Sequence, residues 1–281
     1  LRQFWCNNNR LTSLNVSDRA ELSQFLCDNN QLASLTINGC VALKDFRCEN
    51  NLLTSLDVSR FTVLDYLSCY DNKLTSLKVK GCVALSNINC SNNQLTALDV
   101  SGLIALKTLT MDNNPQLALL DANGCTALTR FDCSGNQLVS LNVSGCTALK
   151  ELICNYNQLT ELNVSGCAAL QELYCNNNQL TSLNVSGYMA LKRLNCSHNQ
   201  LTKLNVSGCT ALINLDCSKN NICEVRPAIF DHIEYLYYDV RYEYQWDSNQ
   251  AKYVVAKDHS KGYWYAHEPE GGCHRPDPCN N

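Results

Sequence analysis

The residues in this chain that could do chemistry are mostly cysteines. Its 281 residues include 19 cysteines and only five histidines. Such a content ordinarily indicates a disulfide framework or metal sites. Ten of the cysteines, however, recur every 21 residues and form one ladder, in which each cysteine is a rung: Cys6, Cys27, Cys48, Cys69, Cys90, Cys133, Cys154, Cys175, Cys196 and Cys217. The ladder is broken once, where Met111 takes the place of a cysteine and one residue is inserted near Pro115. No CxxC or Cys/His cluster recurs within the repeats, so we interpret these cysteines as reduced, small buried hydrophobes.

A second cysteine series follows the same period. Its members are Cys40, Cys82, Cys125, Cys146, Cys167 and Cys209, and it is interrupted by Phe61, Leu103 and Tyr188. Because large apolar side chains replace cysteine there, we interpret this series as packing too.

The ladder defines a repeat, and the repeat predicts the fold. A leucine stands five residues before each rung and an asparagine three residues after it, in eleven consecutive repeats. The unit L-x-x-[LF]-x-C-x-x-N-x-L matches the leucine-rich repeat pattern. The residues before the cysteine alternate as in a short strand, with Phe46 and Cys48 facing the core and Arg47 facing out. We predict a solenoid over residues 1–225 with a curved parallel sheet of about 11–12 strands, one per repeat. We expect its convex side to be irregular or single-turn 3₁₀, and the asparagine amides to bond the backbone of neighbouring coils.

Residues 226–281 depart from the repeat. A degenerate twelfth strand is expected near Ile233–Tyr238, followed by a β-hairpin that joins Tyr242–Trp246 to Lys252–Ala256. This aromatic-rich segment is either a cap over the last coil or a sugar- or peptide-binding patch. Cys273 and Cys279 fit a local disulfide, a disordered tail or, with His267 and His274, a zinc site.

Charge and composition exclude several classes of function. The formal net charge is −4, which gives no electrostatic footprint for nucleic acid or anionic membrane. No apolar run is long enough for a spanning helix. The histidines are scattered and no nucleophile, base and metal site converge, so we expect neither an enzyme nor a cofactor.

Function is therefore expected on the outward side chains of the strands. The tyrosines that no core position needs are the predicted partner contacts: Tyr66, Tyr70, Tyr156 and Tyr174. The charged residues predicted beside them are Arg47, Arg193, Glu151 and Glu172. Trp5 and Leu26 are also outward, but a missing N-terminal cap explains them. We expect a monomer whose partner is a protein or a glycan. One alternative is a structural surface component without a discrete ligand. Another is glycan binding by the C-terminal aromatics Tyr263, Trp264 and Tyr265.

The 21-residue repeat with a cysteine in its strand, as in NQLTSLNVSG at 178–187, resembles the internalin-type bacterial surface proteins that carry a cysteine ladder. Similar repeats occur in secreted proteins of gut Bacteroidetes. The resemblance covers residues 1–225 and implies partner binding outside the cell, as an adhesin or other secreted or cell-surface protein. The helical cap, the immunoglobulin-like module and the wall anchor of internalins have no counterpart in the sequence. Leu1 falls inside a repeat, so we expect a processed or trimmed chain whose export signal precedes it.

Overall fold

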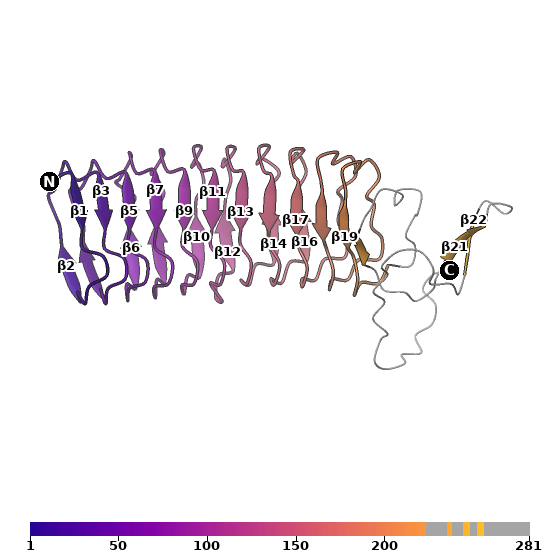
Figure 1. Ribbon diagram of the computed structural model, residues 1–281, viewed down its shortest axis with the longest axis horizontal. Coiled ribbons are helices and arrows are strands. Elements are labelled where there is room, and N and C mark those ends of the chain that lie inside the picture. The colour runs from indigo at the N-terminus through magenta and orange to yellow at the C-terminus, as the bar shows by residue number, and fades with distance from the viewer. Residues whose placement is uncertain (223–234, 238–243, 248–251, 256–281) are drawn as a thin grey trace.

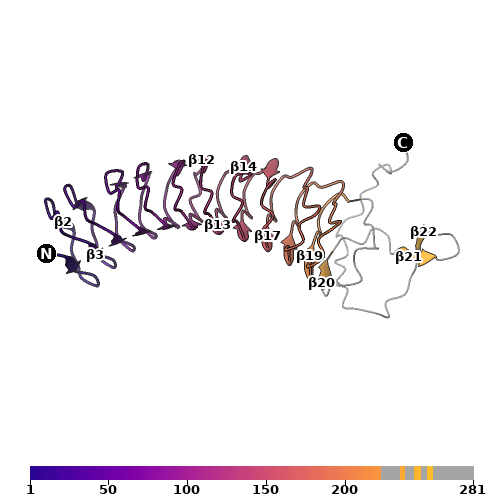
Figure 2. The same cartoon turned by 90° about the horizontal axis from the view of Figure 1, so that it is seen from above.

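The computed structural model describes residues 1–222, 235–237, 244–247 and 252–255. Its coils stack side by side along one axis into a curved solenoid (Figures 1 and 2). The described residues contain strands and turns and no helix. The predicted fold is confirmed.

One parallel sheet of twelve strands lines the concave side of the solenoid. Its strands, in spatial order, are β1 (Gln3–Trp5), β3 (Gln24–Leu26), β5 (Asp45–Arg47), β7 (Tyr66–Ser68), β9 (Asn87–Asn89), β11 (Thr108–Thr110), β13 (Arg130–Asp132), β15 (Glu151–Ile153), β17 (Glu172–Tyr174), β18 (Arg193–Asn195), β19 (Asn214–Asp216) and β20 (Tyr235–Tyr237). Each residue pairs with its counterpart one repeat later, so equivalent side chains form straight rows across the sheet. The inserted residue near Pro115 lengthens one loop without disturbing this register, since Thr108 still pairs with Arg130.

The outer side is more regular than the irregular or 3₁₀ course expected there. It carries a second row of short strands: β2 (Ser13–Asn15), β4 (Ser34–Thr36), β6 (Ser55–Asp57), β8 (Ser76–Lys78), β10 (Ala97–Asp99), β12 (Leu119–Asp121), β14 (Ser140–Asn142) and β16 (Glu161–Asn163). These strands form parallel sheets of two strands each rather than one continuous sheet. Curvature spreads the coils on the convex side, which accounts for the interrupted hydrogen-bond ladder (Figure 2).

The core is a stack of identical layers. From β3 to β19 of the concave sheet, the central residue of each strand points inward, as does the ladder cysteine (or Met111) after it, and Phe25, Phe46, Cys48 and Leu67 are fully buried. The rings of Phe25 and Phe46 are stacked with centroids 5.5 Å apart. Burial raises the pKa of the ladder thiols, that of Cys90 to about 12.

The asparagine that follows each strand ties neighbouring coils together. In Asn51 the side-chain amide donates to the carbonyls of Cys48, at 3.0 Å, and of Cys27 in the preceding coil, also at 3.0 Å. Its oxygen accepts from the backbone N–H of Leu32 at 2.9 Å. The predicted role of these asparagines in joining coils is confirmed.

The second cysteine series does more than fill space. The thiol of Cys40 lies 3.2 Å from the carbonyl of Val16 in the preceding coil, and that of Cys82 lies 3.0 Å from the carbonyl of Val58. Tyr188, which replaces a cysteine, reaches the equivalent carbonyl of Val164 with its hydroxyl at 2.5 Å. The interpretation of this row as packing alone was therefore incomplete, because most of its members also donate a hydrogen bond between coils.

Beyond the last complete coil, the expected twelfth strand is present as β20, which pairs with β19. The expected hairpin is present as β21 (Tyr244–Asp247) and β22 (Lys252–Val255), which pair antiparallel. The predicted cap contacts, Cys273, Cys279, His267, His274 and the segment Tyr263–Tyr265 lie outside the described residues. Among the residues that are described, no helix is long and apolar enough to cross a membrane.

Candidate functional site

The concave face is formed by the outward residues of the twelve-stranded sheet. In a strand, alternate side chains lie on the same face. The first and third residues of each strand, and the residue after the ladder cysteine, therefore face out together. Because the register is straight, each such position becomes a row that crosses the sheet from coil to coil.

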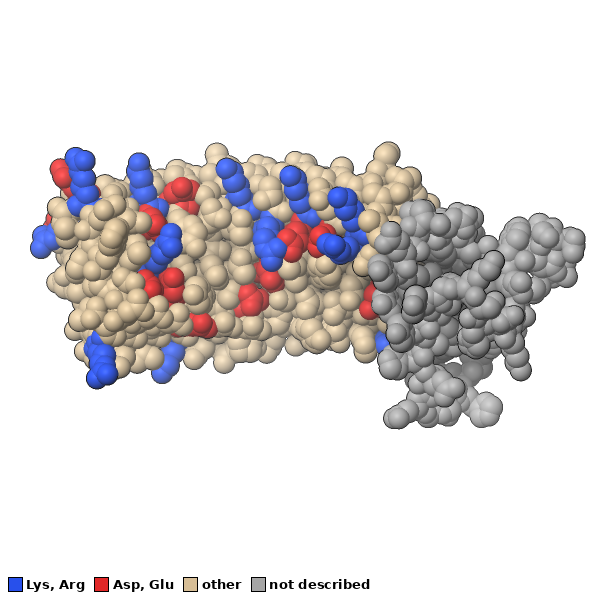
Figure 3. All heavy atoms as spheres, viewed as in Figure 1, with Lys and Arg blue, Asp and Glu red and all other residues tan. Residues whose placement is uncertain are grey.

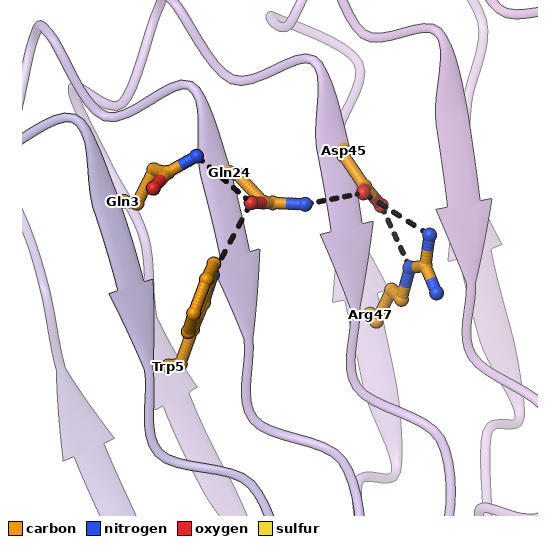
Figure 4. Close-up of polar contacts among 5 residues, drawn as sticks. All are labelled: Gln3, Trp5, Gln24, Asp45 and Arg47. Atoms are coloured by element: carbon orange, nitrogen blue, oxygen red, sulfur yellow. Dashed lines mark hydrogen bonds and ion pairs between the residues drawn. The ribbon is translucent and has the colours of Figure 1, made fainter.

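Hydrogen bonds and one cation–π contact link the first four strands of this face. We call Trp5, Gln24, Asp45, Arg47 and Tyr66 the N-terminal cluster (Figure 4 draws its members other than Tyr66). The indole N–H of Trp5 donates to Gln24 at 3.2 Å, and the amide of Gln24 donates to Asp45 at 2.9 Å. Asp45 accepts two hydrogen bonds from the Arg47 guanidinium, at 3.0 and 3.2 Å. The same guanidinium lies over the ring of Tyr66, 4.8 Å from its centroid.

The N-terminal cluster is held in place by its own contacts. Arg47 pairs with the carboxylate two residues before it, and the hydrogen bond that Arg47 donates to Asp45 raises the pKa of Arg47. Trp5 is 61% exposed although its polar atom is bonded, so its apolar ring faces solvent. Sequence reasoning attributed Trp5 to a missing cap and did not select Gln24 or Asp45. Only the spatial register shows that these residues form one network with Arg47 and Tyr66.

Tyr70 lies after the end of β7 and is separated from Tyr66 by the buried Ser68. Its side chain is half-buried and hydrogen-bonded to Asn50. In the preceding coil, one carboxylate oxygen of Glu49 is buried without a hydrogen-bond partner. Desolvation raises the pKa of Glu49, and Ser68 opposes the shift by donating to it. Tyr70 therefore borders a buried acidic group rather than extending the N-terminal cluster.

A second group of charges lies on β13, β15, β17 and β18. We call Arg130, Glu151, Glu172, Arg193 and Tyr174 the C-terminal cluster. Its four charged residues occupy one row in direct register, with two carboxylates between two guanidiniums. Each glutamate forms an ion pair with the arginine on its outer side. The Tyr174 hydroxyl donates to Glu172 at 2.9 Å, so the structure brings together the predicted residues Glu151, Glu172, Tyr174 and Arg193.

Tyr156 stands apart from both clusters, at the edge where the chain leaves the sheet. Its φ angle is 54°, and the equivalent residue of every other coil also has a positive φ. Those positions hold asparagine, aspartate, glycine, histidine or lysine; only Tyr156 is aromatic. A bulky residue in the left-handed region is strained, and Tyr156 is also 61% exposed. Tyr156 is thus an exposed side chain on a strained backbone.

The described residues contain no cluster of metal-binding side chains. Within them, no group of three or more histidine, cysteine, aspartate or glutamate side chains could hold a metal ion. An open, mainly polar depression on the outer side is lined by Thr160, Glu161, Leu162, Asn163, Thr181, Ser182 and Asn184. Apart from Leu162, its lining side chains carry hydroxyl, amide and carboxylate groups.

Comparison with known proteins agrees with this architecture. A family model described as leucine-rich repeats (2 copies) matches residues 147–187. The functional domain of InlJ from Listeria monocytogenes, which includes a cysteine ladder, superposes with a TM-score of 0.72 at 33% sequence identity. This chain is an internalin-like leucine-rich repeat protein with a cysteine ladder. The match covers 81% of the internalin-like chain and 53% of the InlJ domain, so the chain spans about half of that domain's length.

Two further structures share the fold of the internalin-like chain. The leucine-rich effector YopM of Yersinia pestis matches with a TM-score of 0.63 at 24% identity, covering 86% of this chain and 67% of YopM. The internalin InlF of Listeria monocytogenes matches with a TM-score of 0.53 at 20% identity, covering 80% of this chain and 86% of InlF. A comparison with curated proteins finds no significant match. The leucine-rich repeat fold is typical of protein-interaction modules.

Proposed function

We propose that this protein is a non-enzymatic binding protein, secreted or displayed at the cell surface, that recognises a protein partner on its concave face. The observation that carries the proposal is the N-terminal cluster. There an exposed tryptophan and an arginine are held by hydrogen bonds, and the arginine stacks over a tyrosine ring, before any partner arrives.

Pre-ordering matters because binding loses affinity when mobile side chains must be immobilised. Tryptophan, tyrosine and arginine are also the residues most often found at the centre of protein interfaces. The predicted contacts extend over many coils: at about 4.8 Å per coil, Tyr174 lies about 24 Å from Tyr66. A separation of this size suits a protein surface better than a small metabolite.

Localisation outside the cell is supported by the neighbours. The chain resembles an internalin functional domain over most of its length, and internalin-type proteins are surface proteins. We extend this localisation to the present chain as part of the same proposal.

The test compares three forms of the protein in an affinity capture from host and microbial extracts. The first is the wild type, the second is Trp5→Ala/Arg47→Ala/Tyr66→Ala, and the third is the control Leu119→Ala/Val139→Ala/Met189→Ala, which removes exposed apolar side chains away from the concave face. A protein captured by the wild type is identified and its affinity for the purified variants is measured. We expect the concave variant to lose at least about thirtyfold in affinity and the control to bind as the wild type does. Equal affinities for the concave variant and the wild type would refute the concave site.

A further inference from the structure

The upper edge of the sheet, where the chain enters each strand, carries a row of lysines that the concave site does not use. In the coils that contain β11, β13, β15, β17 and β18, this edge comprises residues 103–108, 125–130, 146–151, 167–172 and 188–193. It holds five basic residues, Lys107, Arg130, Lys150, Lys192 and Arg193, and two acidic ones, Glu151 and Glu172. The edge is thus positive on a chain whose net charge is −4. Figure 3 shows basic side chains projecting along this edge.

The three lysines are the available charges of this edge. Both acids are paired with the arginines, and no ion pair involves Lys107, Lys150 or Lys192 among the described residues. All three lysines are exposed. Their ammonium groups are therefore free to meet a ligand without first breaking an interaction.

The lysines stand in a straight line because the backbone holds them there. Consecutive N–H to carbonyl hydrogen bonds of 2.7–2.8 Å join Lys192 to Gln171, Gln171 to Lys150, Lys150 to Thr129, and Thr129 to Lys107. A lysine thus occurs at every second coil, at intervals of about 9.6 Å for two strand spacings. Between them lie two neutral polar side chains, Thr129 and Gln171. The Thr129 hydroxyl donates to the carbonyl of Lys107 at 3.0 Å, so it can accept a hydrogen bond from a ligand hydroxyl, and the Gln171 amide can both donate and accept.

We propose that this lysine row binds a linear anionic polysaccharide that lies along the solenoid axis. A polysaccharide with one acidic group per disaccharide carries its charges at intervals similar to the lysine spacing. Its hydroxyls suit the threonine and glutamine between the lysines. This site lies at the edge of the sheet and goes beyond the protein-binding role proposed for the concave face.

The same geometry disfavours a nucleic acid. Phosphates follow each other at about 3.4 Å along a strand, nearly three times more densely than these lysines. Binding of single strands also relies on aromatic side chains on which bases stack. The position just before each strand, which carries the lysines, holds no aromatic residue in these coils. Tyr174, three residues after Gln171, is half-buried and bonded to Glu172.

The experiment measures binding of hyaluronan oligosaccharides, which carry one carboxylate per disaccharide, by calorimetry at low and moderate salt. The test variant is Lys107→Gln/Lys150→Gln/Lys192→Gln. The matched control is Lys73→Gln/Lys203→Gln/Lys219→Gln, which removes the same number of exposed lysines from other positions. Circular dichroism checks that both variants fold.

We expect salt-sensitive binding by the wild type and the control, and at least a tenfold loss in the test variant, equivalent to about 1.4 kcal/mol. An equal loss in both variants, or absence of wild-type binding, would overturn the proposal. Tighter binding of a single-stranded DNA oligomer through the same lysines would replace the polysaccharide by a nucleic acid. The variant Trp5→Ala/Arg47→Ala/Tyr66→Ala should bind hyaluronan normally, so failure at the edge and failure at the concave face are distinguishable.

Discussion

The hydroxyl of Tyr188 and the carbonyl of Val164, in adjacent coils, lie 2.5 Å apart. Cys209 makes the corresponding contact one coil later, with its thiol 3.1 Å from the carbonyl of Val185. Two chemically different side chains at the same position of the repeat therefore donate to equivalent backbone carbonyls in successive coils. Phe61 and Leu103 fill the same position in other coils without a side-chain donor, so the donor adds a hydrogen bond to a position that also accepts apolar side chains.

Removing that donor should destabilise the protein. We expect Tyr188→Phe to lower the free energy of unfolding by about 1 kcal/mol, because a part-buried carbonyl loses its partner. Chemical denaturation measures the change. The control is Tyr156→Phe, which removes an exposed hydroxyl and should leave stability unchanged. Equal stabilities of Tyr188→Phe and the wild type would show that the row is packing alone.

The asparagines that follow the concave strands should contribute most to the free energy of unfolding where they join two coils. Asn157→Ala removes bonds to the carbonyls of Cys133 and Cys154 and from the N–H of Leu138, so we expect a loss of about 1–3 kcal/mol. In the first coil Asn9 bonds only carbonyls of its own coil, those of Cys6 and Asn7. Asn9→Ala should therefore cost less, and a reversed order in thermal or chemical unfolding would contradict this assignment.

Tyr156 should be a residue whose replacement stabilises the fold. Asparagine tolerates the left-handed backbone that tyrosine resists, so Tyr156→Asn should raise the free energy of unfolding by about 1 kcal/mol. The reciprocal change, Asn177→Tyr at the equivalent position one coil later, should lower it by a similar amount. Differential scanning calorimetry of the two variants measures both. Destabilisation by Tyr156→Asn would mean that the ring contributes packing that outweighs its backbone strain.

The ladder thiols should be unreactive in the folded protein. Burial raises the pKa of Cys90 and of Cys175 to about 12, so neither is a thiolate at pH 8. Alkylation followed by mass spectrometry should leave both unmodified in buffer and modify all ladder cysteines in denaturant. Modification of Cys90 in buffer before that of the half-exposed Cys6 would contradict the burial argument.

The same shifts predict how stability depends on pH. A thiol whose pKa is higher in the folded state than in the unfolded state contributes its full stability below the unfolded pKa, near 8.5. That contribution is lost as the pH rises toward about 12, because only the unfolded chain then gains from ionisation. The unfolding midpoint in denaturant should therefore fall across this range. A midpoint that stays constant up to pH 11 would be inconsistent with buried, protonated thiols.

Most of the fold could be predicted from the sequence because each coil repeats the same pattern of apolar and polar residues. A leucine, a cysteine and an asparagine at fixed spacing specify a strand, a buried rung and a bonded turn, and stacking is the way in which such a unit buries its apolar side. The strand order, the inward side chains such as Leu67, and the role of the asparagines follow from that periodicity.

The candidate site was harder to predict from the sequence, because it depends on which rows of side chains become neighbours and on the rotamers that bring those side chains into contact. Sequence alone identified Arg47 and Tyr66 as outward residues. It could not show that the guanidinium lies over the ring, or that Gln24 links Trp5 to Asp45, since these contacts join residues 19 and 21 positions apart through side-chain rotamers. The hydrogen bond from Tyr188 to Val164 was hidden for the same reason. The repeat determined the scaffold, while the tertiary register decided which side chains act together, because distances between rows exist only once the coils are stacked.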